Sequence, residues 1–212
     1  MTILYCYDAY CGWCYGFSEV MKKINFTYKE KLQVEVISGG MILPEEPVHI
    51  GASAAYIESA YTKVEEMTGV KFGSDYLWHI KNPQKSDWFP NSEKPAIALC
   101  IFKEYYPDQQ VSFAADMQYA LHYEGRDLCD DEAYRHLVEK YNLPSEEFFS
   151  KLYDEFYKAE AYSEFDLCKR LNVDAFPAVL LQESETKFHL LARGYTDYET
   201  LNERIIAKLK GP

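Results

Sequence analysis

The sequence predicts an α/β fold in which both ends of the chain contribute strands to one sheet and the middle of the chain is a helical insertion. Three observations support this. Residues 2–7 and 32–37 alternate in the way that strands do. From about residue 45 to residue 170 almost no alternating run occurs, and helical signals follow one another. Strand patterns return only at 178–182 and 187–192.

The first two strands are joined by a predicted helix over residues 15–30. Its apolar residues at positions 17, 20, 21 and 24 fit one helical face. A strand, a helix and a strand at this spacing predict a βαβ unit with two parallel strands. The sequence Ser38-Gly39-Gly40 ends the second strand.

The middle of the chain carries a succession of helices delimited by glycine, proline and capping residues such as Gly69, Pro107 and Asp130. The expected helices cover residues 53–67, 75–80, 96–106, 109–123, 130–141, 145–157 and 160–171. We therefore divide the chain into one unit formed by residues 1–44 and 160–212 and a helical insertion formed by residues 45–159.

The last part of the chain predicts a hairpin and a terminal helix. Residues 183–186 form a turn between the two late strands, which we expect to pair antiparallel. Asp197 then begins an amphipathic helix that runs through Leu201, Ile205 and Leu209. The order of elements is therefore βαβ, a helical block, and αββα.

The motif Cys11-Gly12-Trp13-Cys14 lies directly between the first strand and the first helix. In that context the C-x-x-C spacing is typical of dithiol chemistry, because two cysteines on one helical turn can close a reversible disulfide. The N-terminus of a helix also favours a thiolate over a thiol.

Two metal sites compete with this interpretation. A C-x-x-C can be half of a zinc site, but no second half with C-x-x-C, C-x-H or H-x-x-x-H spacing follows. Cys6, Cys11 and Cys14 have the C-x4-C-x2-C spacing of plant-type iron–sulfur proteins, although the intervening residues do not suit a cluster loop. We expect no metal, and we expect Cys6 to be a buried strand residue. Three further cysteines show no paired spacing and are expected to be free thiols: Cys100, Cys129 and Cys168.

The composition is that of a globular chain of 212 residues, with 48% apolar and 26% charged residues. A net charge of −12 argues against nucleic acid or an anionic membrane as the main partner. No apolar run is long enough to span a membrane, and no signal peptide precedes the first strand. We therefore expect a cytoplasmic protein that neither enters the membrane nor binds nucleic acid.

Taken together, the motifs resemble the DsbA family of thioredoxin-fold proteins, and within it the cytosolic branch of FrnE-like protein disulfide isomerases. The resemblance implies a thioredoxin fold, βαβ…αββα, with a large all-helical insertion. It covers nearly the whole chain and rests on the following residues: Asp8-x-x-Cys11-Gly12-Trp13-Cys14-Tyr15-Gly16-Phe17, Gly39-Gly40-Met41, Asn91-Ser92, Asn142-Leu143-Pro144-Ser145-x-x-Phe148 and Asn172-Val173-Asp174-Ala175-Phe176-Pro177-Ala178-Val179.

The resemblance also implies a catalytic site. Pro177 is expected to follow a cis bond and to face the dithiol, where the backbone beside it can pair with an extended substrate. Cys11 is expected to be exposed and to attack a disulfide, and Cys14 to resolve the mixed disulfide. Gly12, Trp13 and Phe176 are the expected substrate-binding residues. The predicted function is a thiol–disulfide oxidoreductase, acting as reductase or isomerase on protein or small-molecule disulfides. Its only prosthetic element would be the redox-active disulfide, with glutathione as a candidate thiol partner; its reductant stays unidentified.

The sequence departs from the family pattern at three positions. Tyr5 stands where thioredoxin-like proteins often have a buried acid, and Asp8 is an alternative acid whose role the sequence leaves open. Phe176 replaces a smaller residue before the proline. Trp13 replaces the histidine of strongly oxidising members, so we expect a less oxidising dithiol.

Two other functions remain open at this point. The first is a glutathione-dependent isomerase or transferase on the same fold, although such relatives usually have serine where this chain has Cys11. The second is a client-binding adaptor without enzymatic activity, which would use the helical insertion and keep a vestigial dithiol.

Overall fold

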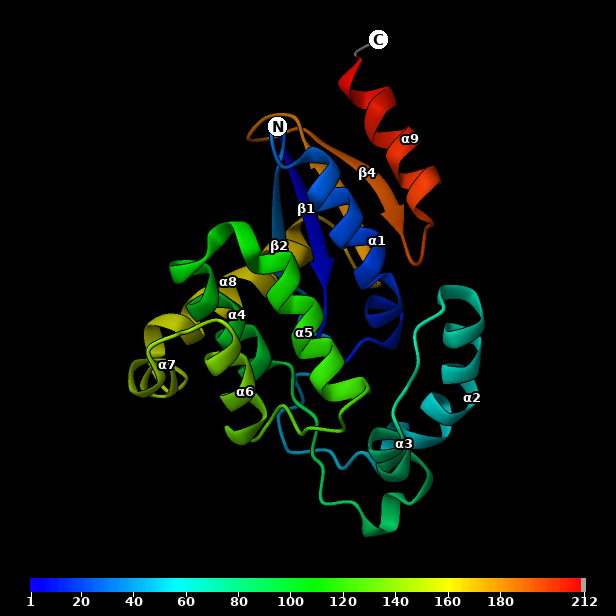
Figure 1. Cartoon of the computed structure of the whole chain (residues 1–212), viewed down its shortest axis with the longest axis vertical. Helices are drawn as coiled ribbons and strands as arrows, with labels where there is room; N and C mark the ends of the chain where they lie inside the picture. The colour runs from blue at the N-terminus through cyan, green and yellow to red at the C-terminus, as the bar shows by residue number, and fades with distance from the viewer. Residues whose placement is uncertain (211–212) are drawn as a thin grey trace.

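The structure, a computed structural model, describes residues 1–210 and contains one four-stranded sheet with the order β2-β1-β3-β4 (Figure 1). β1 is central: it pairs parallel with β2 and antiparallel with β3, and β3 pairs antiparallel with β4. The predicted α/β fold is therefore confirmed. The strands are β1 (Thr2–Tyr7), β2 (Gln33–Ser38), β3 (Ala178–Gln182) and β4 (Phe188–Arg193).

The helices form the rest of the described chain, and none of those within residues 1–210 is both long and apolar enough to span a bilayer. Two short 3-10 turns, η1 (Pro83–Lys85) and η2 (Pro107–Gln109), accompany them. In chain order the α-helices are α1 (Gly12–Tyr28), α2 (Gly51–Thr68), α3 (Ser74–Lys81), α4 (Glu93–Tyr105), α5 (Gln110–His122), α6 (Glu132–Lys140), α7 (Ser145–Lys151), α8 (Glu155–Arg170) and α9 (Tyr198–Leu209).

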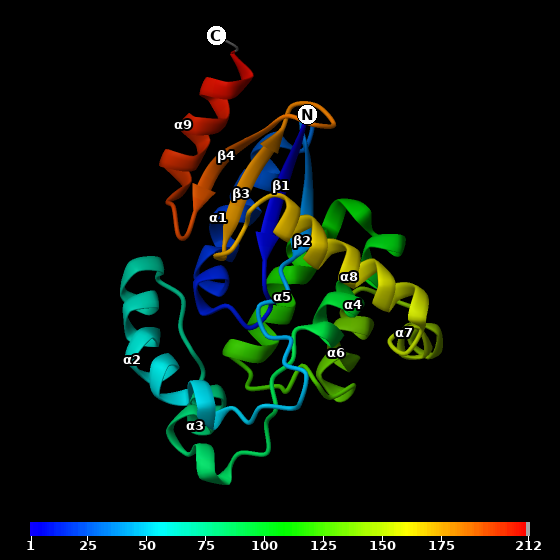
Figure 2. The same cartoon turned by 180° about the vertical axis from the view of Figure 1, so that it is seen from behind.

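The two faces of the sheet carry different helices. On β1, the alternating residues Ile3, Tyr5 and Tyr7 belong to the large core that includes α1, α5 and α9. The intervening residues Leu4 and Cys6 belong to a smaller core on the opposite face, against α8 (Figure 2). The period of two along the strand therefore sorts the side chains between two helical layers.

Side chains of α4, α5 and α8 cover the edge of the sheet at β2. The backbone N–H of Val36 donates to Oε1 of Gln110 at 2.7 Å, and the carbonyl of Val36 accepts from Nζ of Lys103. The backbone N–H of Ser38 donates to Oε2 of Glu164 at 2.7 Å, and Glu164 also pairs with Lys103. These side chains satisfy an edge that would otherwise be open to pairing with another strand.

The helix boundaries differ from the prediction between residues 145 and 171. The sequence predicts one helix to about residue 157 and another from 160, but α7 ends at Lys151 and α8 begins at Glu155. The reason is Asp154, whose carboxylate accepts from the N–H of Phe156 at 2.9 Å and caps α8. The expected boundary between residues 159 and 160 thus falls inside one continuous helix, and the division of the chain into two units stays a prediction.

A fully buried histidine stands at the centre of an aromatic cluster between α1, α3 and α5. The His122 ring lies 5.1 Å from that of Tyr15, 5.4 Å from Phe72 and 5.0 Å from Tyr76, measured between centroids. Neither ring nitrogen has a partner at hydrogen-bonding geometry. Burial lowers the pKa of His122 to about 3, against the opposing effect of the backbone of Ala9.

Replacing the cap of α8 should weaken the protein measurably. We expect Asp154→Ala to lower the free energy of unfolding by about 1 kcal/mol, because it leaves an N–H of the first turn without an acceptor. Chemical denaturation measures the change. The matched control is Asp166→Ala toward the other end of the same helix, an exposed site where the expected change is within about 0.5 kcal/mol. Equal losses in both variants would contradict a capping role.

His122 should make stability depend on pH below neutrality. Its folded pKa lies below the unfolded value, so between the two values the unfolded chain binds a proton that the folded chain does not. The free energy of unfolding should therefore fall by about 1.4 kcal/mol for each pH unit below about 6.5. His122→Phe should remove this contribution, so the variant should lose less stability than wild type between about pH 7 and pH 5. Denaturant titrations at both pH values test this, and parallel losses would show that folded His122 takes up a proton.

Candidate active site

The first turn of α1 brings Cys11 and Cys14 together. Cys11 is the N-cap residue, with φ −80° and ψ 108°, and its Sγ accepts the backbone N–H of Cys14 at 3.2 Å. The N–H of Cys11 itself donates to the carbonyl of Asp8 at 3.1 Å, which fixes the turn between β1 and α1. The sulfur of Cys11 therefore faces the open N–H groups and the positive end of the helix dipole.

The two thiols differ in accessibility and in charge preference. Cys14 is fully buried, and Cys11 is 6% exposed, so the predicted exposure of Cys11 is wrong. The reason is the helical insertion: Cys11 lies in the wall of a cavity that residues of α2 also line. Burial raises the pKa of Cys14 well above the usual thiol value, and the Cys11 sulfur and the Asp8 charge raise it further. Cys14 is therefore a neutral thiol at neutral pH.

The predicted cis bond between Phe176 and Pro177 is confirmed. The carbonyl of Phe176 lies 3.5 Å from Sγ of Cys11, where it can accept a hydrogen bond from the thiol. The Phe176 ring lies so close to the backbone of Gly39 that a Cβ there would come within 2.1 Å of it. Gly39 is therefore required for the loop before β3 to approach the dithiol.

The cavity next to Cys11 has a volume of about 230 Å³ and no charged side chain in its wall. Gly12, Trp13 and Phe176, the predicted substrate-binding residues, all contribute to it. Trp13 is half-buried, with its ring 6.5 Å from that of Tyr195. The remaining wall comes from the following residues: Tyr10, Met41, Ile42, Ser53, Tyr56, Ile57, Ala60, Tyr61, Val64, Phe72 and Tyr76.

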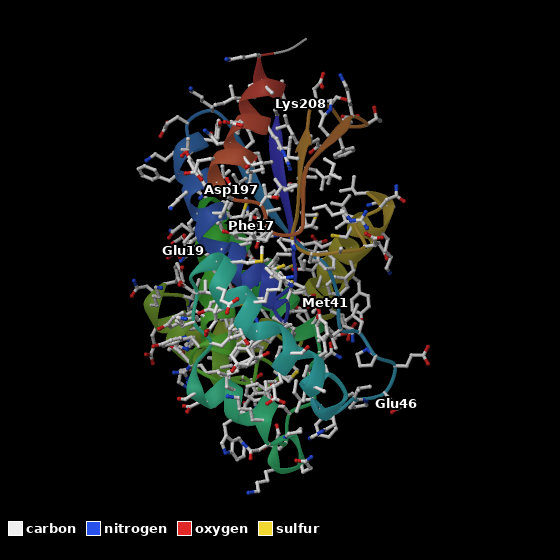
Figure 3. The ribbon with its side chains drawn as sticks, turned by 90° about the vertical axis from the view of Figure 1, so that its right-hand side faces the viewer. Phe17, Glu19, Met41, Glu46, Asp197 and Lys208 are labelled. Atoms are coloured by element: carbon white, nitrogen blue, oxygen red, sulfur yellow. The ribbon has the colours of Figure 1, made fainter. Side chains whose placement is uncertain are left out.

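Sequence reasoning missed the contribution of α2, which crosses in front of the first turns of α1 (Figure 3). Residues 57, 60, 61 and 64 have the spacing of one helical face, and all four line the cavity. Only Ala54 and Val64 of this helix are buried. The sequence did contain a signal for this contribution: α2 has an apolar stripe that the protein core does not fully cover.

Asp8, whose role the sequence leaves open, lies under the site as a buried acceptor. Its carboxylate accepts from the N–H of Tyr10 at 3.0 Å, the N–H of Met41 at 2.8 Å and the hydroxyl of Ser92 at 3.0 Å. Burial raises the pKa of Asp8, while these hydrogen bonds act in the opposite direction. Because Ser92 also accepts from the N–H of Ile42 at 3.0 Å, one carboxylate joins three separate segments.

The other cysteines do not converge on the dithiol. Cys6 and Cys168 lie in the smaller core on the opposite face of the sheet, so Cys6 cannot share a site with Cys11 and Cys14. Cys129 lies 3.3 Å from the hydroxyl of Tyr10, and Cys100 lies 3.8 Å from Oε1 of Glu164. All six are free thiols. Over residues 1–210 no group of three or more His, Cys, Asp or Glu side chains is arranged to hold a metal ion.

Neither protein-family models nor curated protein sequences match this chain. Solved structures do. A candidate protein disulfide isomerase from Nitrosomonas europaea is 22% identical, with a TM-score of 0.86 over 99% of this chain and 97% of that one. The cytosolic disulfide reductase DsbM from Pseudomonas aeruginosa is 23% identical, with a TM-score of 0.77 over 99% and 98%. A 2-hydroxychromene-2-carboxylate isomerase is 13% identical, with a TM-score of 0.67 over 99% and 95%.

At these identities the matches establish the fold. Each extends over almost the full length of both chains, so it includes the helical insertion as well as the sheet. The resemblance found in the sequence is thereby confirmed at the level of architecture: the chain has the DsbA-like thioredoxin fold, with a helical insertion between the two parts of its sheet.

Proposed function

We propose that this protein is a thiol–disulfide oxidoreductase that acts as a reductase or isomerase on protein or small-molecule disulfides. One observation carries the proposal. The sulfur of Cys11 accepts an N–H at the start of α1 and lines an apolar cavity, while Cys14 stands fully buried one turn behind it. Because of this difference in burial, a substrate can reach Cys11, whereas Cys14 can react only with Cys11.

In the first step the Cys11 thiolate attacks one sulfur of a substrate disulfide. A bond forms between Cys11 and that sulfur, the substrate S–S bond breaks, and the departing sulfur leaves as a thiolate that takes up a proton. The N–H of Cys14 and the N-terminal end of α1 stabilise the attacking thiolate. The carbonyl of Phe176 lies 3.5 Å from Cys11 and marks the backbone along which an extended substrate can align.

In the second step Cys14 resolves the mixed disulfide. The Cys14 thiol gives up its proton and attacks Sγ of Cys11, the bond between Cys11 and the substrate breaks, and the substrate leaves as a thiol. The substrate has gained two electrons, and the protein holds a Cys11–Cys14 disulfide. An isomerase instead lets a second substrate thiol displace Cys11 before this step. Gly12, Trp13 and Phe176 contact the substrate, and Pro177 keeps the adjoining backbone free of an N–H.

The cavity favours disulfides that carry an apolar group beside the reacting sulfur, because its wall has no charged side chain. Glutathione remains a candidate thiol partner, and the Pseudomonas aeruginosa reductase has been solved with it. That reductase is cytosolic, which supports a cytoplasmic place for this protein. The chain needs no further cofactor for this chemistry, because both redox groups are its own thiols.

A glutathione-dependent isomerase is the second candidate, because one neighbour in fold is a 2-hydroxychromene-2-carboxylate isomerase. Two features count against it here. Both cysteines of the motif are present, and the cavity offers no cation for the carboxylates of glutathione. Glutathione-dependent isomerisation of a substrate without a disulfide, retained in a chain that lacks both Cys11 and Cys14, would favour this second candidate.

Serine variants should separate the roles of the two cysteines. With a disulfide-linked peptide as substrate, Cys14→Ser should accumulate a mixed disulfide on Cys11, because the resolving thiol is gone. Cys11→Ser should reduce exchange to the uncatalysed rate and accumulate none, because Cys14 lies behind the cavity wall. Non-reducing electrophoresis with peptide mapping measures both. Equal trapping by the two variants would contradict the assignment.

The dithiol should have a potential nearer to thioredoxin's, about −270 mV, than to DsbA's, about −120 mV. The reason is that Trp13 and the cavity wall supply no cation beside Cys11. Equilibration with a glutathione redox series measures the value. Trp13→His is the matched variant and should make the dithiol more oxidising. A wild-type potential above about −150 mV would show that N–H groups and the helix dipole alone stabilise the thiolate strongly.

A further inference from the structure

Tyr5 carries a buried hydroxyl that the fold does not use. The residue is 2% exposed, and its hydroxyl has no hydrogen-bond partner. A buried hydroxyl without a partner weakens the folded state, so its retention needs a reason. The ring itself is firmly packed, with centroids 5.9 Å from Phe17 and 5.7 Å from Tyr7.

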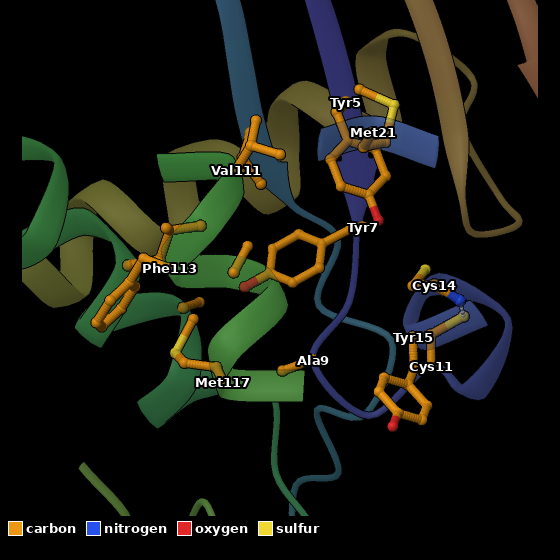
Figure 4. Packing of buried hydrophobic residues seen from close by; sticks show 14 of the residues in the cluster. Tyr5, Tyr7, Ala9, Cys11, Cys14, Tyr15, Met21, Val111, Phe113 and Met117 are labelled. Atoms are coloured by element: carbon orange, nitrogen blue, oxygen red, sulfur yellow. Dashed lines mark hydrogen bonds between the residues drawn. The ribbon is translucent and has the colours of Figure 1, made fainter. Parts of the chain in front are cut away.

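The unused hydroxyl is directed toward the dithiol. In Figure 4 the hydroxyl end of Tyr5 points from β1 toward the first turn of α1, where Cys14 lies. Burial raises the pKa of Tyr5 well above its ordinary value, and the next contributions come from Cys14 and then from Cys11. Tyr5 therefore keeps its proton and has an O–H group to donate toward the thiols. Tyr7, two residues along the same strand face, points toward α5 instead.

The second chemical step needs a donor at this place. To attack the mixed disulfide, Cys14 must become a thiolate although it is fully buried, and burial opposes that charge. The N–H of Cys14 is already directed at Cys11. A neutral hydroxyl from β1 could stabilise the Cys14 thiolate without placing a cation in the site. A cation would stabilise the Cys11 thiolate as well.

We propose that Tyr5 serves the resolving step, its hydroxyl donating a hydrogen bond to Sγ of Cys14 as that thiol gives up its proton and attacks Sγ of Cys11. The bond between Cys11 and the substrate breaks in the same step, and the substrate leaves as a thiol with the proton. No other oxidant or reductant takes part. In the resting protein the hydroxyl has no partner at hydrogen-bonding geometry, and in the proposed step the contact forms as Cys14 becomes charged.

This role for Tyr5 rests on the proposed dithiol function, so the test separates the two. The probe is dithiobis(nitrobenzoate), a symmetrical aromatic disulfide whose released thiolate is coloured. Attack by Cys11 releases one coloured thiolate, and resolution by Cys14 releases the second, so one absorbance trace reports both steps. Cys100→Ser and Cys129→Ser in all proteins remove the two half-buried thiols outside the site.

We expect Tyr5→Phe to leave the first release unchanged and to slow the second roughly tenfold or more, the usual effect of losing a hydrogen bond to a charged group. The pH profile of the second release should move to higher pH. Tyr7→Phe, the matched loss of a buried hydroxyl from the same strand face, should change neither release. Tyr5→Phe should also be at least as stable as wild type in denaturant titration, because it removes an unpaired group.

Three outcomes would overturn the role of Tyr5: a second release in Tyr5→Phe as fast as in wild type, an unmoved pH profile, or an equal delay in Tyr7→Phe. A wild-type protein that releases no second thiolate at all would instead overturn the proposed dithiol function. The two failures are thus distinguishable.

Discussion

The site depends on one buried negative charge. A carboxylate removed from water costs several kcal/mol unless hydrogen bonds replace its hydration. Asp8 meets this demand with donors from three segments: Tyr10 in the dithiol turn, Met41 after β2, and Ser92 before α4. None of these segments belongs to a strand or to the middle of a helix. The hydrogen bonds to Asp8 therefore join three loops that the helices and strands alone do not connect. Two of these loops line the cavity beside Cys11.

The helical insertion completes both the sheet and the site. At β2, Gln110 and Lys103 of the insertion take the place of a neighbouring strand together with Glu164 of α8, because they bond the outward backbone groups of Val36 and Ser38. At the other end, α2 encloses the sulfur that an isolated thioredoxin-like unit would expose. The insertion thus helps to prevent the β2 edge of the sheet from pairing with another strand, and it also narrows access to the dithiol. More than half of the residues that line the cavity therefore come from the insertion, while both cysteines of the motif come from the βαβ unit.

What the sequence could predict was local. The strands, the dithiol turn and the proline before β3 each depend on residues within a few positions of one another, so their patterns are visible in the chain. The cavity depends on residue 41, the face of α2 that carries residues 57 and 61, and residue 176. These three segments meet only after folding, and no spacing in the sequence links them. The partners of Asp8 are hidden for the same reason. The start of α8 was locally encoded by Asp154, but the helix-forming residues on both sides concealed the break. Burial of Cys11 could not be foreseen, because the helix that covers it lies forty residues further along the chain.

The two thiols differ because they stand at different places on one helix. At the N-cap, the sulfur of Cys11 faces the N–H groups that the helix cannot satisfy itself, so a charge there is solvated by the backbone. Three residues on, Cys14 has entered the core, where burial raises its pKa and favours the neutral thiol. In the proposed mechanism this spacing assigns Cys11 as the attacking sulfur and Cys14 as the resolving one, without a cation in the cavity wall. The same burial that protects Cys14 hinders its ionisation in the second step. In the proposed resolving step a neutral donor would stabilise the Cys14 thiolate, and the unpaired hydroxyl of Tyr5 lies on the adjoining strand and points toward this turn.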